Sequence, residues 1–323
     1  MSIHLPLRSP ALLLAASIWL TCSILVADEA VTPTTNVPEL FATGLVDHSA
    51  IRCDGEGNVL ATNYRHAGTV GQINAETGAS ILFEVPAAMG QDTKLPLVGL
   101  ALDGDGRVLT LDSQQGKIFR WNPETMMVSV VVDRIQGRRF DSLFAIAVGP
   151  GGNIYFSEPD SSSLETPNGA VYRFDVATNR PTLVADGLDQ PTGICLSSNG
   201  KFLFVAEAGR SRINVFALKE DGVVEKARTY FLDSMLDLDN GTEIGRLGHM
   251  TIDRRGWLYV TLWDQGNIAV IDTNSGKLLE TIGCCSDRVF GVTLWQDALL
   301  MSIPSKEAIF RLDLRPLISR HAP

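Results

Sequence analysis

Residues 146–155 read Ile-Ala-Val-Gly-Pro-Gly-Gly-Asn-Ile-Tyr, and this phrase returns along the chain. It is an apolar-x-apolar run, three small or polar residues, a turn glycine, one further residue and two apolar residues. Further copies occupy residues 51–60, 100–109, 194–203, 250–259 and, in a worn form, 292–300. Their turn positions lie 42–56 residues apart. Short strands and tight turns at a period of about 40–50 residues predict an all-β fold, a six-bladed β-propeller.

Each repeat supplies the four strands that a propeller blade needs. The apolar-x-apolar run is the first strand, and the two apolar residues after the turn begin the second. A third strand alternates apolar and polar residues with a period of two, as in residues 118–121, 171–174, 213–216, 268–271 and 309–312. This alternation indicates half-buried strands. The fourth, outer strand is weaker, as in residues 180–185.

The two ends of the repeat array predict how the ring closes. Residues 38–45 match residues 181–188 as an outer strand followed by a crossing turn, whereas the last repeat ends near Leu314 after a third strand. The N-terminal strand should therefore complete the final blade, which removes exposed sheet edges. We predict one domain, residues 38–315, followed by a tail, residues 316–323. The longest insertion, residues 233–246, is expected to overhang one face.

The N-terminus has the features of an export signal. Arg8 precedes an apolar run over residues 11–27 that breaks at Asp28. A basic start, a short apolar core and a small residue before a polar stretch are typical of a secretory signal, here cleaved near Ala27. The alternative is an uncleaved anchor. Residues 28–37 are predicted to be a flexible lead-in, and the mature protein to be secreted or periplasmic without a membrane anchor.

The charge of the chain limits the kinds of molecule that it can bind, and its cysteines can be interpreted from their positions. The net charge is −10 and the Lys and Arg residues are not clustered, which argues against nucleic acid or an anionic membrane as a partner. We expect a monomer that binds a small molecule. The cysteines Cys53 and Cys195 are predicted to be small buried hydrophobic residues. Residues 284–285 are both cysteine and could form a metal site, a strained vicinal disulfide or an ordinary turn.

Polar side chains are expected to gather at one end of the channel. In a propeller blade the first strand begins, and the second strand ends, at the same face. The three histidines of the predicted domain fall there, namely His48, His66 and His249. Glu158 and Glu207 occupy equivalent loops in neighbouring blades. Imidazoles near carboxylates serve as general bases or metal ligands, although polar loop ends are also common without any function.

The repeats resemble those of a known family. Residues 145–148, 152–159, 191–196, 200–207 and 248–253 are similar to the gluconolactonase and senescence-marker-protein (regucalcin) family of six-bladed propellers. The repeat phrases are shared with the NHL-repeat and strictosidine-synthase-like propellers. The resemblance implies a lactonase with a divalent cation, often calcium, at the mouth of the channel. It covers nearly the whole domain.

The metal ligands that the resemblance implies are replaced in this chain. The family's Glu position falls on or beside His48, with Asp47 as the alternative if the alignment is shifted by one residue. Its Asn positions fall on Phe144 and Thr192, and its Asp position falls on Gly248 beside His249. Phenylalanine cannot bind a metal, and imidazole suits zinc or another transition metal better than calcium. A calcium site by family, a zinc or other transition-metal site by histidine content, and no metal at all are the alternatives.

Several residues at the mouth remain candidates for the roles of a hydrolase. His249 or His48 would act as the base with Glu207 as its partner, and weak metal-ligand candidates are His48, Glu158 and Glu207. The candidates for substrate binding are Arg65, His66, Phe144, Thr192, Arg210 and Trp263.

Three functions compete. The first is a lactone or ester hydrolase. The second is a non-catalytic binding propeller, favoured by the lost ligands and by the apolar residues Val98, Phe144 and Phe290 at the mouth. The third is a metal-assisted lyase that resembles virginiamycin B lyase.

Overall fold

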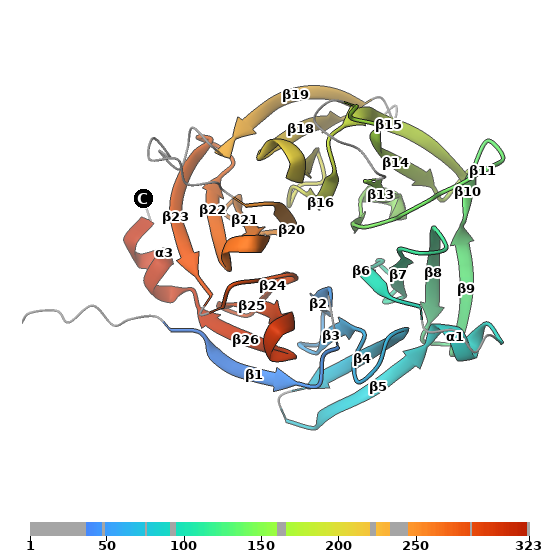
Figure 1. Cartoon of the computed structure of the whole chain (residues 1–323), viewed down its shortest axis with the longest axis horizontal. Helices are drawn as coiled ribbons and strands as arrows, with labels where there is room; N and C mark the ends of the chain where they lie inside the picture. The colour runs from blue at the N-terminus through green and yellow to red at the C-terminus, as the bar shows by residue number, and fades with distance from the viewer. Residues whose placement is uncertain are drawn as a thin grey trace, which may run out of the picture. The chain divides into compact units, whose positions relative to one another are not determined.

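The computed structural model describes residues 37–46, 49–74, 76–90, 95–159, 166–219, 224–232, 245–284 and 286–321. Within them the strands form six four-stranded antiparallel sheets arranged in a ring (Figure 1). They belong to one compact unit, residues 36–323. No helix in this described part of the chain is long and apolar enough to span a membrane. The predicted six-bladed β-propeller is confirmed.

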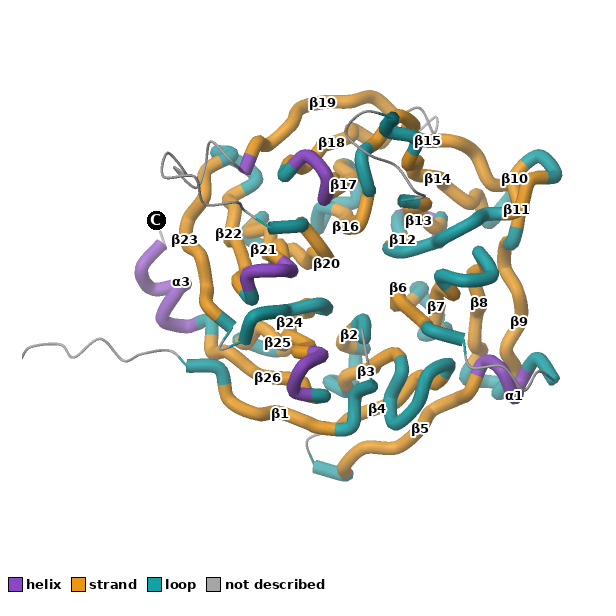
Figure 2. The backbone as a smooth tube through the Cα atoms, in the orientation of Figure 1, coloured by secondary structure: helices purple, strands orange, loops and turns teal. Residues whose placement is uncertain are grey.

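Each blade is a meander whose first strand lies nearest the channel and whose fourth lies on the outside (Figure 2). Blade one contains β2 (Ile51–Cys53), β3 (Val59–Thr62), β4 (Thr69–Asn74) and β5 (Gly78–Glu84). Blade two contains β6 (Leu97–Leu102), β7 (Val108–Asp112), β8 (Lys117–Asn122) and β9 (Met127–Val132). Blade three contains β12 (Ile146–Val148), β13 (Ile154–Glu158), β14 (Gly169–Asp175) and β15 (Arg180–Leu188).

The second half of the ring repeats this plan. Blade four contains β16 (Pro191–Leu196), β17 (Phe202–Glu207), β18 (Arg212–Leu218) and β19 (Val224–Phe231). Blade five contains β20 (Leu247–Ile252), β21 (Trp257–Leu262), β22 (Asn267–Asp272) and β23 (Lys277–Gly283). Blade six contains β24 (Val292–Trp295), β25 (Ala298–Ile303), β26 (Ala308–Asp313) and β1 (Glu39–Thr43).

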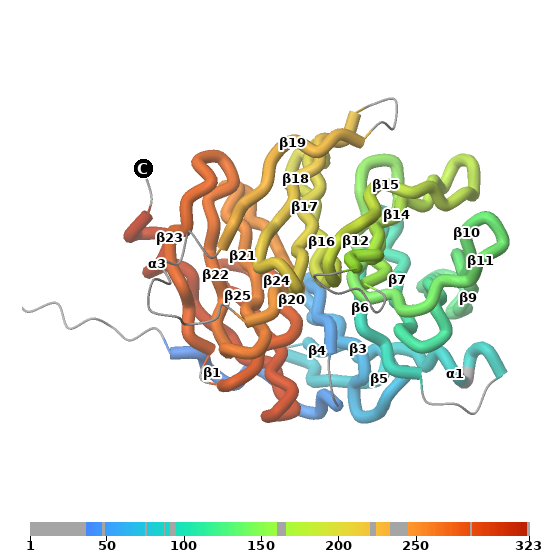
Figure 3. Tube along the Cα trace, turned by 45° about the horizontal axis from the view of Figure 1, so that its top comes forward, coloured from blue at the N-terminus to red at the C-terminus, as the bar shows by residue number. Residues whose placement is uncertain are grey.

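The N-terminal strand closes the ring as predicted. β1 pairs antiparallel with β26, with Glu39 opposite Arg311 and Thr43 opposite Ala308. The blue strand therefore lies beside red ones both down the short axis (Figure 1) and in the turned view (Figure 3). Because a strand from the start of the chain completes the last sheet, blade six has no unpaired outer edge at β26.

Short elements complete the ring. The helix α1 (Val85–Ala88) connects blades one and two, and a β-hairpin of β10 (Arg134–Ile135) and β11 (Arg138–Arg139) connects blades two and three. The 3-10 turns connect strands within blades three to six; they are η1 (Pro150–Gly152), η2 (Ala208–Arg210), η3 (Trp263–Gln265) and η4 (Pro304–Lys306). The helix α3 (Arg315–His321) follows the last strand. The stretch expected as a tail thus contains α3, whose buried Leu317 packs with Leu312 and Leu314.

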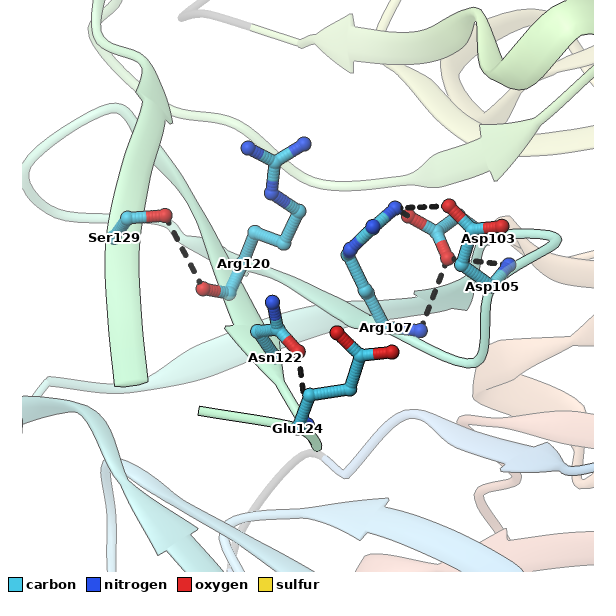
Figure 4. Close-up of polar contacts among 7 residues, drawn as sticks. All are labelled: Asp103, Asp105, Arg107, Arg120, Asn122, Glu124 and Ser129. Atoms are coloured by element: carbon cyan, nitrogen blue, oxygen red, sulfur yellow. Dashed lines mark hydrogen bonds and ion pairs between the residues drawn. The ribbon is translucent and has the colours of Figure 1, made fainter. Parts of the chain in front are cut away.

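The turns between first and second strands lie at one face of the ring, here called the turn face. The turn of blade two shows how such a turn is held (Figure 4). The Oδ1 atom of Asp103 accepts hydrogen bonds from the N–H groups of Asp105 and Arg107 at 3.0 and 2.9 Å. The Arg107 guanidinium pairs with both carboxylates. The opposite face carries the channel opening expected to bind a ligand, here called the mouth.

The core lies between adjacent blades, where apolar side chains from facing sheets interdigitate. Cys53 and Cys195 are free thiols, and Cys195 is buried, in line with a packing role. Cys53 was predicted to be buried but is half-buried, and Cys284 is buried. Burial raises the pKa of the Cys195 thiol to about 11, which keeps it in the unreactive protonated form. Residues 1–36, His48, residues 233–244 and Cys285 lie outside the described residues. The predictions made for them stay predictions.

Candidate functional site

The mouth is built around a ring of small residues. The strand registers align the position just before the first core residue of each blade. Five blades carry Ala or Gly there, and blade five carries histidine: Ala50, Gly99, Ala145, Gly193, His249 and Gly291. A Cβ atom on Gly193 would lie 2.3 Å from the Gly248 carbonyl oxygen, so only glycine lets β16 and β20 approach this closely. His249 is the one large side chain in a ring that otherwise leaves room for it.

Aromatic rings from three blades meet around this histidine. The group formed by Phe144, His249, Trp263 and Phe290 is here called the mouth cluster. His249 stacks on Phe144 with ring centroids 5.6 Å apart and lies 4.7 Å from Phe290. Phe144 and Phe290 come from blades three and six and approach to 5.9 Å. Phe290 is buried, whereas the other three rings are partly exposed, so the cluster offers solvent an apolar surface that includes one imidazole ring, whose Nε2 atom is buried.

Trp263 extends the cluster toward a charged rim. Its ring lies 5.2 Å from Phe290 and carries the Arg246 guanidinium at 4.8 Å from its centroid. Arg246 also binds both carboxylate oxygens of Asp264, at 2.8 and 2.9 Å. These hydrogen bonds hold the pKa of the Asp264 carboxyl below its usual range. The rim therefore fixes the orientation of the indole while remaining nearly neutral.

Thr192 and Arg210 lie beside the strand that carries His249. The Thr192 hydroxyl donates to the Leu247 carbonyl at 2.6 Å, which links blade four to the strand that carries His249. Arg210 belongs to η2, which lies beside β20, and its Nε atom is 3.7 Å from the buried Asp189 carboxylate. Arg210 is partly exposed, so its guanidinium is a cation next to the histidine strand, in addition to Arg246.

The two glutamates proposed as metal ligands are engaged by neighbouring arginines. Glu207 is fully buried and accepts hydrogen bonds from Arg212 at 2.7 and 3.1 Å, from Asn214, and from the Asp189 N–H at 2.8 Å. Glu158 accepts hydrogen bonds from Arg138 at 2.8 and 2.7 Å. Both carboxylates thus clamp the loops around them, and a role in catalysis or metal binding stays a prediction.

Arg65 and His66 occupy the exposed loop after β3. The Arg65 guanidinium lies over the Tyr64 ring at 5.4 Å, and the His66 Nε2 atom is 3.3 Å from Glu84. The contacts described for both side chains are within blade one. His48, the other predicted base, falls outside the described residues. Of the predicted site residues, the structure brings together His249, Phe144 and Trp263, with Thr192 and Arg210 beside them.

The described residues do not suit a divalent cation at the mouth. Among residues 37–321, apart from the undescribed gaps, no group of three or more His, Cys, Asp or Glu side chains could hold a metal ion. Phe144 and Thr192 replace two of the ligands that the family resemblance implies, and the Thr192 hydroxyl is committed to a carbonyl. The oxygens of Glu158 and Glu207 are taken by other donors. The mechanism proposed below therefore uses no metal ion.

Three residues that contact the predicted site residues were not themselves predicted as site residues, namely Phe290, Arg246 and Arg138. Phe290 stands at the same register position in blade six as Phe144 in blade three, so the repeat alignment carried its signal. Arg246 follows a poorly patterned insertion, and nothing local marks it as a partner of Trp263. Arg138 is presented by the β10–β11 hairpin, whose two-residue turn, residues 136–137, has positive φ at both positions. The glycine at the second position of this turn, Gly137, is the signal that the sequence offers.

Replacing Glu158 by Gln should lower stability in a pH-dependent way. Burial raises the pKa of Glu158, but hydrogen bonds from Arg138, the Asp141 N–H and Tyr172 outweigh it, so the folded-state pKa is lowered. A lowered carboxyl pKa stabilises the fold above the unfolded value of roughly 4.3, and this contribution is lost as pH falls through the folded value. We expect E158Q to cost about 1–3 kcal/mol at pH 7 by urea denaturation, with a smaller difference at acid pH.

Asp133→Asn is the matched control for that measurement. Asp133 pairs with Arg134 on the surface, where an ion pair contributes roughly 0–1 kcal/mol. Equal losses in the two variants, or a Glu158 effect that does not shrink at acid pH, would contradict the clamp.

Comparison with known proteins identifies the same family that the repeats resemble. Residues 66–297 match the family model described as the SMP-30/Gluconolactonase/LRE-like region. A gluconolactonase of Zymomonas mobilis is 26% identical over 251 residues, which cover 71% of this chain and 70% of that protein.

Two solved structures share the fold. The gluconolactonase XC5397 of Xanthomonas campestris has a TM-score of 0.66 at 19% identity, covering 84% of this chain and 87% of the other. A regucalcin of Agrobacterium tumefaciens, described as a calcium-binding protein, has a TM-score of 0.67 at 15% identity, with 85% and 93% covered. At these identities the structures support the fold alone.

Proposed function

Because this chain belongs to the SMP-30/Gluconolactonase/LRE-like family, we propose that it hydrolyses a lactone or a related ester at the mouth of its channel. The observation that carries the proposal is the position of His249. It is the one imidazole in a ring of Ala and Gly residues, and it stacks against Phe144 where the channel opens. A small-molecule substrate fits both the family and this apolar surface.

The chemistry follows from an imidazole beside an apolar surface. Neutral His249 takes a proton from water, which attacks the lactone carbonyl carbon and forms a tetrahedral oxyanion. Collapse of this intermediate breaks the bond to the ring oxygen, which receives the proton from the imidazolium. One lactone and one water give one hydroxy acid.

The other mouth residues position the reactants. The exposed faces of Phe144 and Trp263 exclude water from one side of the lactone ring, which strengthens electrostatic interactions there. Arg210 beside the histidine strand supplies positive charge for the developing oxyanion or the carboxylate product. Arg65 and His66 in blade one are proposed as outer contacts for an anionic substituent.

Hydrolysis of simple lactones tests this proposal. The purified protein is mixed with glucono-1,5-lactone and with dihydrocoumarin, an aromatic lactone, and acid release is followed with a pH indicator, before and after treatment with EDTA. We expect hydrolysis that survives chelation, because the described residues do not offer a cation site. Full loss of the rate after chelation would instead indicate a metal ligand set that includes the undescribed His48.

A second candidate is a binding propeller without catalysis. The observation in its favour is the aromatic surface itself, which replaces metal ligands with Phe144 and Phe290. Binding of the same lactones by calorimetry, with no turnover under any condition, would favour this function.

We further propose that the mature protein is an exported monomer. The support is the basic Arg8 before the apolar run over residues 11–27. N-terminal sequencing of the secreted or periplasmic protein should begin just after Ala27, and light scattering should give the mass of one chain.

A further inference from the structure

The turn face carries a cleft between blades four and five. Its volume is about 380 Å³, which is within the range of small-molecule sites. Its apolar wall comes from blade four and includes the buried side chains of Phe204, Val215 and Tyr230. This cleft lies at the opposite face from the mouth cluster and shares no residue with it.

Three arginines line the rim of this cleft. They are Arg228 on β19 and Arg254 and Arg255 in the turn between β20 and β21, and no carboxylate side chain lines the cleft with them. Arg255 is partly neutralised by Asp253 at 3.3 Å. Arg228 and Arg254 form no ion pair with any carboxylate among the described residues. In a chain of net charge −10, this is a local concentration of positive charge next to an apolar wall.

The equivalent turn of blade two shows that this charge is not a requirement of the fold. There the sequence is Asp-Gly-Asp-Gly over residues 103–106, and the following Arg107 is neutralised by both aspartates (Figure 4). In blade five the two middle positions are Arg254 and Arg255. The backbone turn forms with either charge, so the arginines are available to bind a ligand.

Neighbouring side chains fix the arginine turn in place. The Ser198 hydroxyl of blade four donates to the Asp253 carbonyl at 2.9 Å, and the Asn274 amide donates to the Arg255 carbonyl at 3.3 Å. The Tyr230 hydroxyl in the cleft wall donates to the Thr273 carbonyl at 2.9 Å. The rim is therefore held against the wall before any ligand arrives, which lowers the cost of binding.

We propose that this cleft is a second binding site, for an organic anion whose ring-sized apolar body lies on the Tyr230 wall and whose oxyanion pairs with Arg228 and Arg254. Guanidinium groups bind carboxylate and phosphate oxygens in the same forked geometry, so the anionic group is a carboxylate or a phosphate. The site is separate from the mouth, and the proposal does not depend on lactone hydrolysis.

Calorimetric titration with three probes tests the site. Benzoate and phenyl phosphate carry the two candidate oxyanions on one ring, and benzyl alcohol is their neutral counterpart. We expect binding of at least one anion and none of the alcohol, and the tighter anion identifies the oxyanion class. Affinity should fall by about tenfold or more in R228Q and in R254Q. The matched control R134Q removes a surface arginine outside the cleft and should bind as the unmodified protein does.

Three results would overturn the proposal. The first is that neither anion binds, although R134Q and the unmodified protein melt at the same temperature. The second is that R228Q and R254Q bind the anions as tightly as R134Q does. The third concerns the mouth. The titration is repeated with H249A, whose mouth is altered but whose cleft is intact. Unchanged affinity there is expected, whereas loss of anion binding in H249A would assign the anions to the mouth.

Discussion

Deleting residues 38–46 should leave a protein without a cooperative unfolding transition, because this segment joins the last blade to the first. The N–H groups of Gly44 and Leu45 donate to the Glu307 carbonyl in blade six, at 3.0 and 3.1 Å. Val46 donates to the Asn63 carbonyl in blade one at 3.0 Å. Losing these bonds and the β1–β26 pairing should cost about as much as the whole stability of a domain, about 5–15 kcal/mol.

A pair of leucines within the segment makes the test quantitative. Leu45 is 1% exposed and packs with Tyr64, Leu300 and Ile309, whereas Leu40 on β1 is 61% exposed. We expect L45A to lose about 2–5 kcal/mol in urea denaturation and L40A to stay within about 0.5 kcal/mol. A deletion variant that melts cooperatively at the original midpoint, or equal losses in the two leucine variants, would show that the ring does not need this closure.

The blades and their closure could be predicted because each depends on local sequence. Period-two alternation marks the third strands, and the turn phrase recurs at every junction between first and second strands. The match between residues 38–45 and 181–188 then determines which strand lies outermost in blade six. Each signal is a pattern of a few adjacent residues that is recognised because it repeats along the chain, so none needs knowledge of tertiary contacts.

The binding partners of the two mouth carboxylates could not be predicted in the same way. Glu158 and Glu207 stand at equivalent positions in the repeat, and sequence alone allows them to face a cation or a cationic side chain. The outcome depends on whether an arginine reaches them. Arg138 arrives from a hairpin 20 residues earlier, and Arg212 from the next strand of the same blade. Such pairings follow from tertiary geometry, which the repeat pattern does not encode.

The importance of His249 was partly visible in the sequence. Its place at the channel mouth follows from the repeat alignment. The contrast with Ala50, Gly99 and the other small residues requires the strand register, which pairs Met250 with Val260 and so places His249 one residue before the first core position. The stacking of His249 on Phe144 of blade three can be recognised only in the closed ring, which brings the two blades together.

Replacing His249 by Ala should abolish most of the proposed activity while leaving the fold intact. Alanine already occupies this register position at Ala50 and Ala145, so the backbone of blade five tolerates it. Loss of a general base lowers the rate by about 10²–10⁴-fold. We expect that fall in kcat for lactone hydrolysis, with a small change in KM because the rings of Phe144 and Trp263 remain.

His66→Ala is the matched control, since His66 lies on the same face but contacts Glu84 in blade one. H66A should keep kcat within a few-fold, because His66 is proposed only as an outer substrate contact and its loss should act on KM. Both variants should melt near the unmodified protein. Added imidazole separates chemistry from packing, because a free base in the vacated space can take the proton from water. Partial recovery of kcat in H249A, and none in H66A, is the expected result.

A large loss of stability in H249A with unchanged kcat would mean that the imidazole only supports the mouth cluster. It stacks within 5.6 Å of Phe144 and 4.7 Å of Phe290, so a packing role is physically reasonable. The two roles nevertheless differ in what they require at this position. Packing needs a ring, which His249→Phe supplies, whereas proton transfer needs a nitrogen. H249F should therefore melt like the unmodified protein and hydrolyse lactones as slowly as H249A.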